Sequence, residues 1–287
     1  LDKKKTASNY ICAFKHFKRF RGDQDIAIED LTVGQMKDFQ SYLIGEGLRM
    51  NTISLYNREL RAVYNYALDE EIIQMDKRPF RKSFTGQEKT RKRAVDGGVV
   101  KRLAILSLID KEMLGFARDL FLFSIYMQGM PFIDMAYLKK EQVRNGCITY
   151  QRRKTNRQLR VKIHPQAQII IDRYMVSDPG CPYLFPILYD PEKKTEREYS
   201  SALRVYNKRL DSLSSLLELD EPLTSYVARH TWASLARQCG TSDTVISEAM
   251  GHSHVGVTTI YLASLDIGMV AMANQRVITS LFRKRIP

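Results

Sequence analysis

The sequence predicts a mainly α-helical protein of two helical parts, with a small antiparallel sheet in the second part. Apolar residues recur at helical spacing through the first 80 residues, as in Ile53, Tyr56 and Leu60. A basic stretch at 77–93 shows no apolar period. Beyond it the helical pattern resumes, and only one pair of segments is typical of strands, CITYQ at 147–151 and QLRVKI at 158–163.

The first part reads as three amphipathic helices with recognisable ends. Thr32 and Asn51 are placed to cap the second and third helices, because their side chains can accept from free backbone N–H groups. The sequence GEG at 45–47 is a stop between these two helices. A fourth, short helix is expected near Ile72.

The stretch from Lys77 to Arg93 holds eight basic residues against one acid, Glu88, and reads as an exposed linker. A solvated loop and a nucleic-acid contact remain equally open for it. We therefore divide the chain into a helical domain at 1–80, a basic linker at 81–94 and a larger domain at 95–287.

The larger domain begins with a core helix around Leu114 to Tyr126. The two strand segments form a basic hairpin joined by a polar turn at 152–157. Further helices are expected at 199–219, at 224–238 with Thr224 as cap and Gly240 as stop, at 243–250 and at 266–282.

Charge limits the partners. The 287 residues carry 45 Lys and Arg against 32 Asp and Glu, a net charge of +13 that favours nucleic acid or an anionic membrane. No apolar stretch reaches the roughly 20 residues that span a bilayer, so we expect no membrane partner. The four cysteines form no CxxC pair, which favours a reducing compartment. We therefore expect the protein in the cytoplasm, at the bacterial nucleoid.

Four polar residues together fit one reaction, the attack of a tyrosine on a phosphodiester. Arg229 offers two donors for phosphate oxygens, Lys154 on the hairpin can protonate the leaving oxygen, and His252 and Tyr261 follow downstream. Singly, a helical Arg is usually a surface residue, a GH pair a turn and a Tyr among apolar neighbours a core residue. No carboxylate cluster of the kind used in two-metal hydrolysis occurs, so we expect no metal and no other cofactor.

In this order and spacing the motifs ARHTW, GH and the downstream Tyr resemble the tyrosine recombinase (phage integrase) family, and RRKTNRQLRVKI is similar to its lysine hairpin. The resemblance spans the chain and implies the DNA breaking-rejoining fold, with a SAM-like core-binding domain before the catalytic domain. It implies that Tyr261 is the nucleophile, Arg229 a phosphate clamp, Lys154 the general acid and His252 a hydrogen-bond donor. The activity implied is integration or excision of a mobile element through a 3′-phosphotyrosine.

Two positions depart from the family pattern. Tyr226 stands where the family usually has His; its hydroxyl can donate to phosphate, but with a pKa near 10 it shuttles protons poorly. Pro131 occupies the place of the first family arginine. In a branch resembling Bacteroides-type integrases an Arg precedes the Gly instead, but Gln128 stands there. Either another cation replaces the missing charge, or the enzyme is slow, or cleavage is lost. The candidates for replacement are Arg118, Lys139, Arg144 and Arg152.

Double-stranded DNA is the expected partner, and its contacts should weaken steeply with salt. The residues expected to bind it are Arg152, Arg153 and Arg157 of the hairpin and Lys89, Arg91, Lys92 and Arg93 of the linker. The resemblance implies a homotetramer on paired DNA sites, with accessory directionality factors as further partners. The rival interpretations are a type IB topoisomerase and a non-catalytic DNA-binding regulator.

Overall fold

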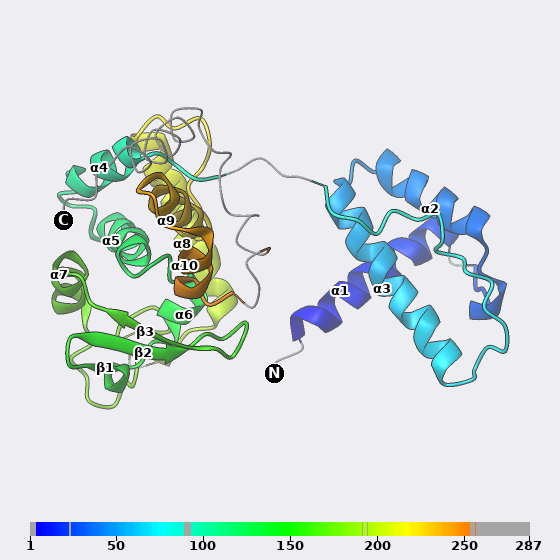
Figure 1. The fold of residues 1–287 in the computed structure, drawn as a ribbon, viewed down its shortest axis with the longest axis horizontal. Coiled ribbons are helices and arrows are strands. Elements are labelled where there is room, and N and C mark those ends of the chain that lie inside the picture. The colour runs from blue at the N-terminus through cyan, green and yellow to red at the C-terminus, as the bar shows by residue number, and fades with distance from the viewer. Residues whose placement is uncertain are drawn as a thin grey trace, which may run out of the picture. The chain divides into compact units, whose positions relative to one another are not determined.

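Figure 1 shows the chain as a computed structural model that describes residues 4–22, 24–88, 93–190, 192–193, 195–252 and 256. These residues form two compact units that divide between Arg91 and Lys92. The described part is mostly helical with small antiparallel sheets, as the sequence predicts. Among the described helices, none combines the length and apolar character that crossing a bilayer requires.

The N-terminal unit consists of three helices around an aromatic core. They are α1 (Lys4–Arg21), α2 (Val33–Gly45) and α3 (Met50–Asp69). Phe39 of α2 is fully buried and lies with its ring centroid 5.1 Å from that of Phe17 and 5.6 Å from that of Phe20, both on α1. This aromatic cluster joins the helices, since aromatic side chains bury large apolar areas.

Two of the expected helix boundaries are confirmed in this unit. Thr32 caps α2 in a reciprocal capping box with Gln35, and α2 ends at Gly45 with Gly47 at a φ of +76°. The expected cap at Asn51 is wrong, because α3 begins one residue earlier at Met50. The Asn51 side chain instead exchanges two hydrogen bonds with the backbone of Glu88.

The short helix expected near Ile72 is also wrong. Residues 70–75 form turns and bends, and Glu71 has a φ of +55°, which ends helical geometry directly after α3. Ile73 is buried, so the apolar pattern that suggested a helix belongs to a turn packed on the core.

The basic segment after this turn is not a free linker over its first part. Phe80 is buried in the N-terminal core. The carbonyl of Phe84 accepts from Asn57 at 3.0 Å, and the carbonyl of Gly86 accepts from Ser54 at 2.6 Å. The chain therefore stays attached to α3 as far as Glu88, while residues 81–88 are exposed or half-buried, as expected of the linker.

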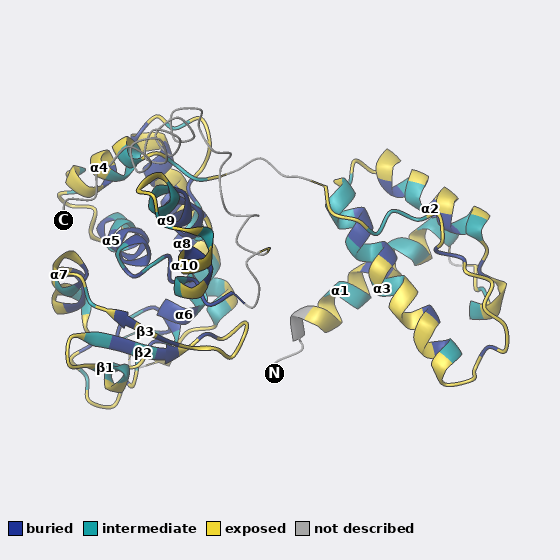
Figure 2. Cartoon of the chain, viewed as in Figure 1, coloured by how far each residue is buried: buried dark blue, intermediate teal, exposed yellow. Residues whose placement is uncertain are grey.

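The C-terminal unit places α5 (Glu112–Tyr126) at the centre, as the expected core helix. Residues 119–125 of α5 are all buried, and Figure 2 shows the helix in the buried colour along most of its length. The helices that pack against it are α4 (Gly97–Ile105), α7 (Pro165–Tyr174), α8 (Tyr199–Leu216) and α9 (Val227–Gln238). The unit also contains α6 (Phe132–Ala136) and α10 (Asp243–Ala249).

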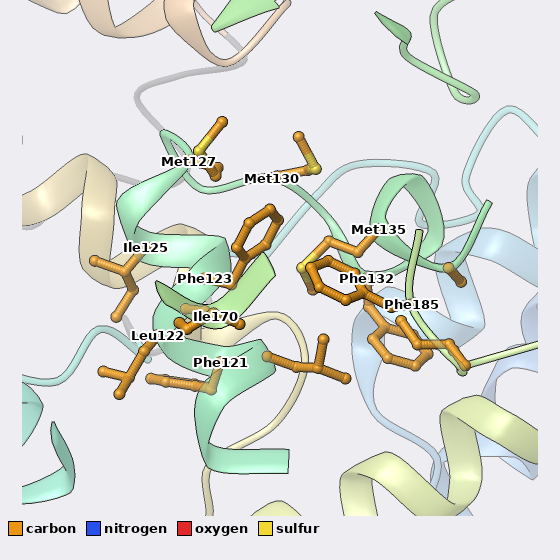
Figure 3. Close-up of a cluster of buried hydrophobic side chains, with 14 of the residues drawn as sticks. Phe121, Leu122, Phe123, Ile125, Met127, Met130, Phe132, Met135, Ile170 and Phe185 are labelled. Carbon is orange, nitrogen blue, oxygen red and sulfur yellow. The ribbon is translucent and has the colours of Figure 1, made fainter. Parts of the chain in front are cut away.

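The core that supports the site runs from α5 through the turn into α6. Figure 3 shows Phe121 and Phe123 of α5 together with Met130, Phe132 and Phe185, all of them buried. The rings of Phe123 and Phe185 meet edge to face with centroids 5.0 Å apart. This packing fixes the turn at residues 127–131, which carries part of the site.

The expected hairpin is confirmed. Strands β2 (Cys147–Gln151) and β3 (Gln158–Lys162) pair antiparallel, with Ile148 opposite Val161. Their inward residues are buried and their outward residues are exposed or half-buried, which is the alternation that the sequence shows. The sequence did not predict the short strands β1 (Val143–Arg144), β4 (Tyr189–Asp190) and β5 (Thr195–Glu196).

The helix that carries Arg229 begins later than expected. α9 starts at Val227, with Tyr226 at the N-cap, so Thr224 is not its cap. Gly240 has a φ of +86° and ends the helix region as predicted, and α10 begins after a Ser242 cap. The helix expected at 266–282 lies outside the described residues.

Candidate active site

Arg229 lies in the first turn of α9 and is almost fully buried, with 2 % of its surface exposed. Its Nη1 donates to the carbonyl of Gly129 at 2.7 Å, and its Nη2 donates to the carbonyl of Met250 at 2.6 Å. Gly129 has a φ of +70°, and a Cβ there would lie 3.2 Å from the Cα of Arg229. The turn before α6 therefore requires glycine to receive this guanidinium.

His252 contacts the same guanidinium. Nη2 of Arg229 lies 3.0 Å from His252 Nε2, and because a guanidinium only donates, Nε2 is the acceptor and the ring proton is on Nδ1. Burial, followed by the positive charges of Arg229, Arg152 and Lys154, lowers the pKa of His252 to about 3. At neutral pH the imidazole is thus uncharged and offers its Nδ1–H as a donor.

Arg152 supplies a second buried guanidinium at this place. It is 4 % exposed, and its Nη1 donates to the carbonyl of Gly251 at 2.7 Å. Its Nε is buried and has no hydrogen-bond partner within the described residues. Arg229 and Arg152 therefore donate to consecutive carbonyls, those of Met250 and Gly251, at the sequence motif GH.

The other cations considered as replacements for the first family arginine lie elsewhere. Arg118 pairs with Asp119 at 2.7 Å, Lys139 pairs with Glu141 at 3.6 Å, and Arg144 donates to the carbonyl of Glu141. These contacts belong to the surface of α5 and to the turn before β1. Of the four candidates, Arg152 is the one that contacts the Gly251–His252 turn.

Asp134 of α6 is the buried acid beside these cations, with 3 % of its surface exposed. Its Oδ1 accepts from the backbone N–H of Arg153 at 3.0 Å, while Oδ2 is buried without a hydrogen-bond partner in the described part of the chain. Burial raises the pKa of Asp134, and the N–H of Arg153 and the charges of Arg152 and Arg229 act against that rise. One carboxyl thus faces two buried guanidiniums, and the balance of charge is positive.

Lys154 lies in the loop 152–157 that joins β2 to β3, and it is exposed. The loop rests on the turn after α10, because Thr155 Oγ1 donates to the carbonyl of Gly251 at 3.3 Å and Arg157 Nη1 donates to the carbonyl of His252 at 3.1 Å. The structure therefore brings the lysine loop together with Arg229 and His252, which are 75 and more residues away in the sequence.

Tyr226, at the N-cap of α9, is 47 % exposed and lies three residues before Arg229. Its ring centroid is 5.3 Å from that of His230, which is 9 % exposed. Tyr226 is thus at the same end of α9 as Arg229, and His230 is packed beneath it.

The remaining predicted residues fall into two groups. Arg153 is exposed, with its guanidinium 3.8 Å from the centre of the Tyr137 ring, and Arg93 is exposed. The others lie outside the described residues, so the structure does not place them: Tyr261, Lys89, Arg91 and Lys92.

The turn that lacks the family arginines has a backbone that explains its residues. Gln128 and Gly129 both have positive φ, at +59° and +70°, and Pro131 precedes α6 with a φ of −62°. Asp134 and the burial of Arg152 escaped the sequence reading. The one sequence signal for a role of Arg152 in the site is its position two residues before Lys154.

This arrangement suits a pentacoordinate phosphate. Two guanidiniums, a neutral imidazole and an exposed lysine loop lie around one turn, and the net charge is positive. No group of three or more metal-ligating side chains occurs among the described residues. The fold and this site define a phosphoryl-transfer protein of the DNA breaking-rejoining class.

Comparison with protein families gives the assignment. Residues 1–84 match the phage integrase SAM-like domain, and residues 102–266 match the phage integrase family. The chain belongs to the phage integrase family and is a tyrosine-type site-specific DNA recombinase. Comparison with curated proteins finds no match to this sequence.

Solved structures have the same fold. A lambda integrase (75–356) dimer bound to a COC′ core site is 16 % identical, with a TM-score of 0.69, and the match covers 92 % of this chain and 93 % of that chain. The Tn1549 transposon integrase (82–397, Y379F) in complex with transposon right end DNA is 12 % identical, with a TM-score of 0.75, and 96 % and 94 % are covered. The family assignment does not favour the topoisomerase and regulator interpretations.

Proposed function

We propose that the cluster of cations at the Gly251–His252 turn is the site where Tyr261 cleaves DNA. The phenol oxygen of Tyr261 would form a bond to phosphorus, the bond from phosphorus to the 5′ oxygen would break, and a 3′-phosphotyrosine would result. Its bond energy is retained for rejoining, so neither ATP nor a metal is needed. The observation that carries this proposal is the convergence of Arg229, Arg152 and His252 on one turn.

Each residue has a distinct part. Arg229 clamps the nonbridging phosphate oxygens, and His252 donates through Nδ1–H. Tyr226 donates to phosphate from the start of α9, and Lys154 gives its proton to the leaving 5′ oxygen. These assignments extend the family pattern to this chain position by position, except at Tyr226, which stands where the family usually has His.

Arg152 replaces the missing first arginine. It is buried beside Arg229, and its Nε is available to an incoming anion within the described structure. Within the described residues the Arg152 guanidinium donates to the Gly251 carbonyl and interacts electrostatically with Asp134. Burying this charge is costly without an anion, and a phosphate would supply one. Arg152 therefore belongs to the chemistry of the site more than to contact with the outer DNA backbone.

DNA binding involves a wider surface. Arg153 of the hairpin and Lys89, Arg91, Lys92 and Arg93 at the junction of the two units would contact phosphates. Lambda integrase forms a dimer on its core site and a tetramer on a Holliday junction in solved structures. For this chain we propose a homotetramer on two paired sites in the bacterial nucleoid, with directionality factors as further partners.

The test is a covalent trap. When a duplex with a nick beside the cleavage site is cut, the short fragment that carries the 5′-hydroxyl leaving group diffuses away. Without this hydroxyl the phosphotyrosine cannot reverse, and a protein–DNA adduct accumulates and can be seen on a denaturing gel. We expect the wild-type chain to form the adduct, and mass spectrometry of the digest to locate the link at Tyr261. Tyr261→Phe should bind the duplex normally and form none. If the wild-type chain forms no adduct on duplexes with the end sequences of the mobile element that encodes it, the proposal is contradicted.

A further inference from the structure

The loop that carries Lys154 is held on two sides. On one side Asp134 of α6 accepts from the backbone N–H of Arg153 at 3.0 Å. On the other side Thr155 Oγ1 donates to the carbonyl of Gly251 at 3.3 Å. Lys154, which is exposed, therefore lies between two anchored neighbours.

Arg157 makes the third attachment and makes it with both arms of its guanidinium. Nη1 donates to the carbonyl of His252 at 3.1 Å, and Nη2 lies 3.7 Å from Oε1 of Glu248 on α10. An exposed ion pair of this length stabilises little by itself. The fork geometry matters more, because it aligns the exit of the loop with the turn that contains His252.

The loop itself transmits this attachment to Lys154. Arg152 N donates to the Arg157 carbonyl at 2.8 Å, and Asn156 N donates to the Arg152 carbonyl at 2.7 Å. Asn156 has a φ of +54°, as a tight turn requires. The residues between 152 and 157 therefore cannot shift independently of Arg157.

We propose that Arg157 is a positioning residue that holds the Lys154 loop on the Gly251–His252 turn, and that it acts on catalysis through the proton delivered by Lys154. This inference rests on the proposed function above. It assigns Arg157 an internal role in place of the DNA phosphate contact that the basic hairpin suggested. Its guanidinium is already directed at a carbonyl and a carboxylate of its own chain.

A change of leaving group separates the two roles. In the ordinary reaction the 5′ oxygen leaves only as it takes a proton. When a sulfur replaces the bridging 5′ oxygen, it leaves as a thiolate and needs no proton, because thiols ionise near pH 8.5. The sulfur substrate therefore restores the cleavage rate of a variant that misplaces the general acid. It does not restore the rate of a variant that holds the DNA or the phosphorane poorly.

The experiment measures adduct formation in single turnover on nicked duplexes with an oxygen or a sulfur at the scissile 5′ position. The variants are Arg157→Ala, Arg157→Lys and Lys154→Ala, with Arg160→Ala as the matched control. Arg160 is an exposed arginine on β3 of the same hairpin, so its removal costs the same charge. Thermal unfolding and duplex affinity are recorded for each variant.

We expect Arg157→Ala and Arg157→Lys to slow cleavage of the oxygen substrate about 10- to 100-fold, since a small displacement of a catalytic group has effects of this size. The sulfur substrate should restore the wild-type rate in both variants and in Lys154→Ala, and Arg160→Ala should be near wild type on both. Arg157→Lys is the second variant, because it keeps the charge but not the fork.

Two results would overturn the inference while leaving the proposed function intact. One is a slow cleavage rate of the Arg157 variants that persists on the sulfur substrate, or a cleavage rate that falls together with duplex affinity in the Arg157 variants and in Arg160→Ala alike. The other is a normal rate for Arg157→Ala on the oxygen substrate. A wild-type chain that forms no adduct with either substrate would instead overturn the proposed function, and the positioning role with it.

Discussion

The two units of the chain differ in whether their described residues bury charged side chains. In the described part of the N-terminal unit the buried polar side chains are the uncharged Ser54 and Asn57. The described part of the C-terminal unit buries Asp119, Asp134, Arg152 and Arg229. Burying a charge is unfavourable unless it is paired, so each of these four groups needs either partners or a function.

Within the C-terminal unit the buried acids also differ. Asp119 is fully satisfied, because Arg118, Arg173 and the hydroxyl of Tyr174 all donate to it. Asp134 keeps one buried oxygen without a partner among the described residues. The contrast is between an acid whose donors are all present and an acid that keeps one oxygen unpaired beside the cations of the candidate site.

The largest expected effect tests the N-terminal unit as an independent apolar core. Phe39→Ala should destabilise it by about 3 to 5 kcal/mol, because a buried aromatic ring is replaced by a cavity between α1 and α2. Calorimetry should show the transition of the N-terminal unit moving to lower temperature while that of the C-terminal unit stays in place. A single transition that moves as a whole would break the comparison.

The next effect tests the buried charge. Arg152→Gln should lower the rate of adduct formation about 100- to 1000-fold, the usual consequence of losing one preorganised donor to the developing phosphorane. Duplex affinity should change little, since Arg152 is buried. Arg160→Gln on the neighbouring strand is the control. Equal rates of adduct formation for Arg152→Gln and Arg160→Gln would show that the buried guanidinium of Arg152 does not contribute to catalysis.

The smallest effect concerns His252 and pH. Its pKa is about 3 in the folded protein against 6.5 in the unfolded chain, so the unfolded chain binds the proton first as pH falls. Stability from this group is complete above pH 6.5 and is lost on acidification towards pH 3. Between pH 7 and pH 5 the loss should be on the order of 1 to 2 kcal/mol in urea unfolding.

The control for this pH effect is His252→Gln, which cannot titrate. Asp134, whose pKa is raised, contributes in the opposite sense, and comparing wild type with the variant cancels its contribution. The slope of stability against pH in this window should be smaller in the variant. Equal slopes would mean that burial and the neighbouring cations do not lower the pKa of His252.

Local signals predicted much of the fold because local physics decides it. Thr32 caps its helix through Gln35, three residues away, and the hairpin at 147–163 follows from alternation of buried and exposed side chains. The wrong cap at Asn51 has the opposite origin. Its side chain bonds to Glu88, 37 residues away, and no local pattern reveals such a partner.

The candidate site divides along the same line. Lys154, Arg229 and His252 could be found because their residue types and order match a family. The position of Arg152 depends on its contact with Gly251, 99 residues later, and sequence alone left it as one of four candidates. The place of Tyr226 at the N-cap depended on where α9 begins, and Thr224 was the more obvious cap.

The return of the chain along α3 has a practical consequence for isolating the first unit. A fragment cut at the end of the third helix would leave the side chains of Ser54 and Asn57 without their carbonyl acceptors and uncover the space filled by Phe80. Ending the fragment just after Glu88 keeps these contacts, and such a piece is the one to purify for studying that unit by itself.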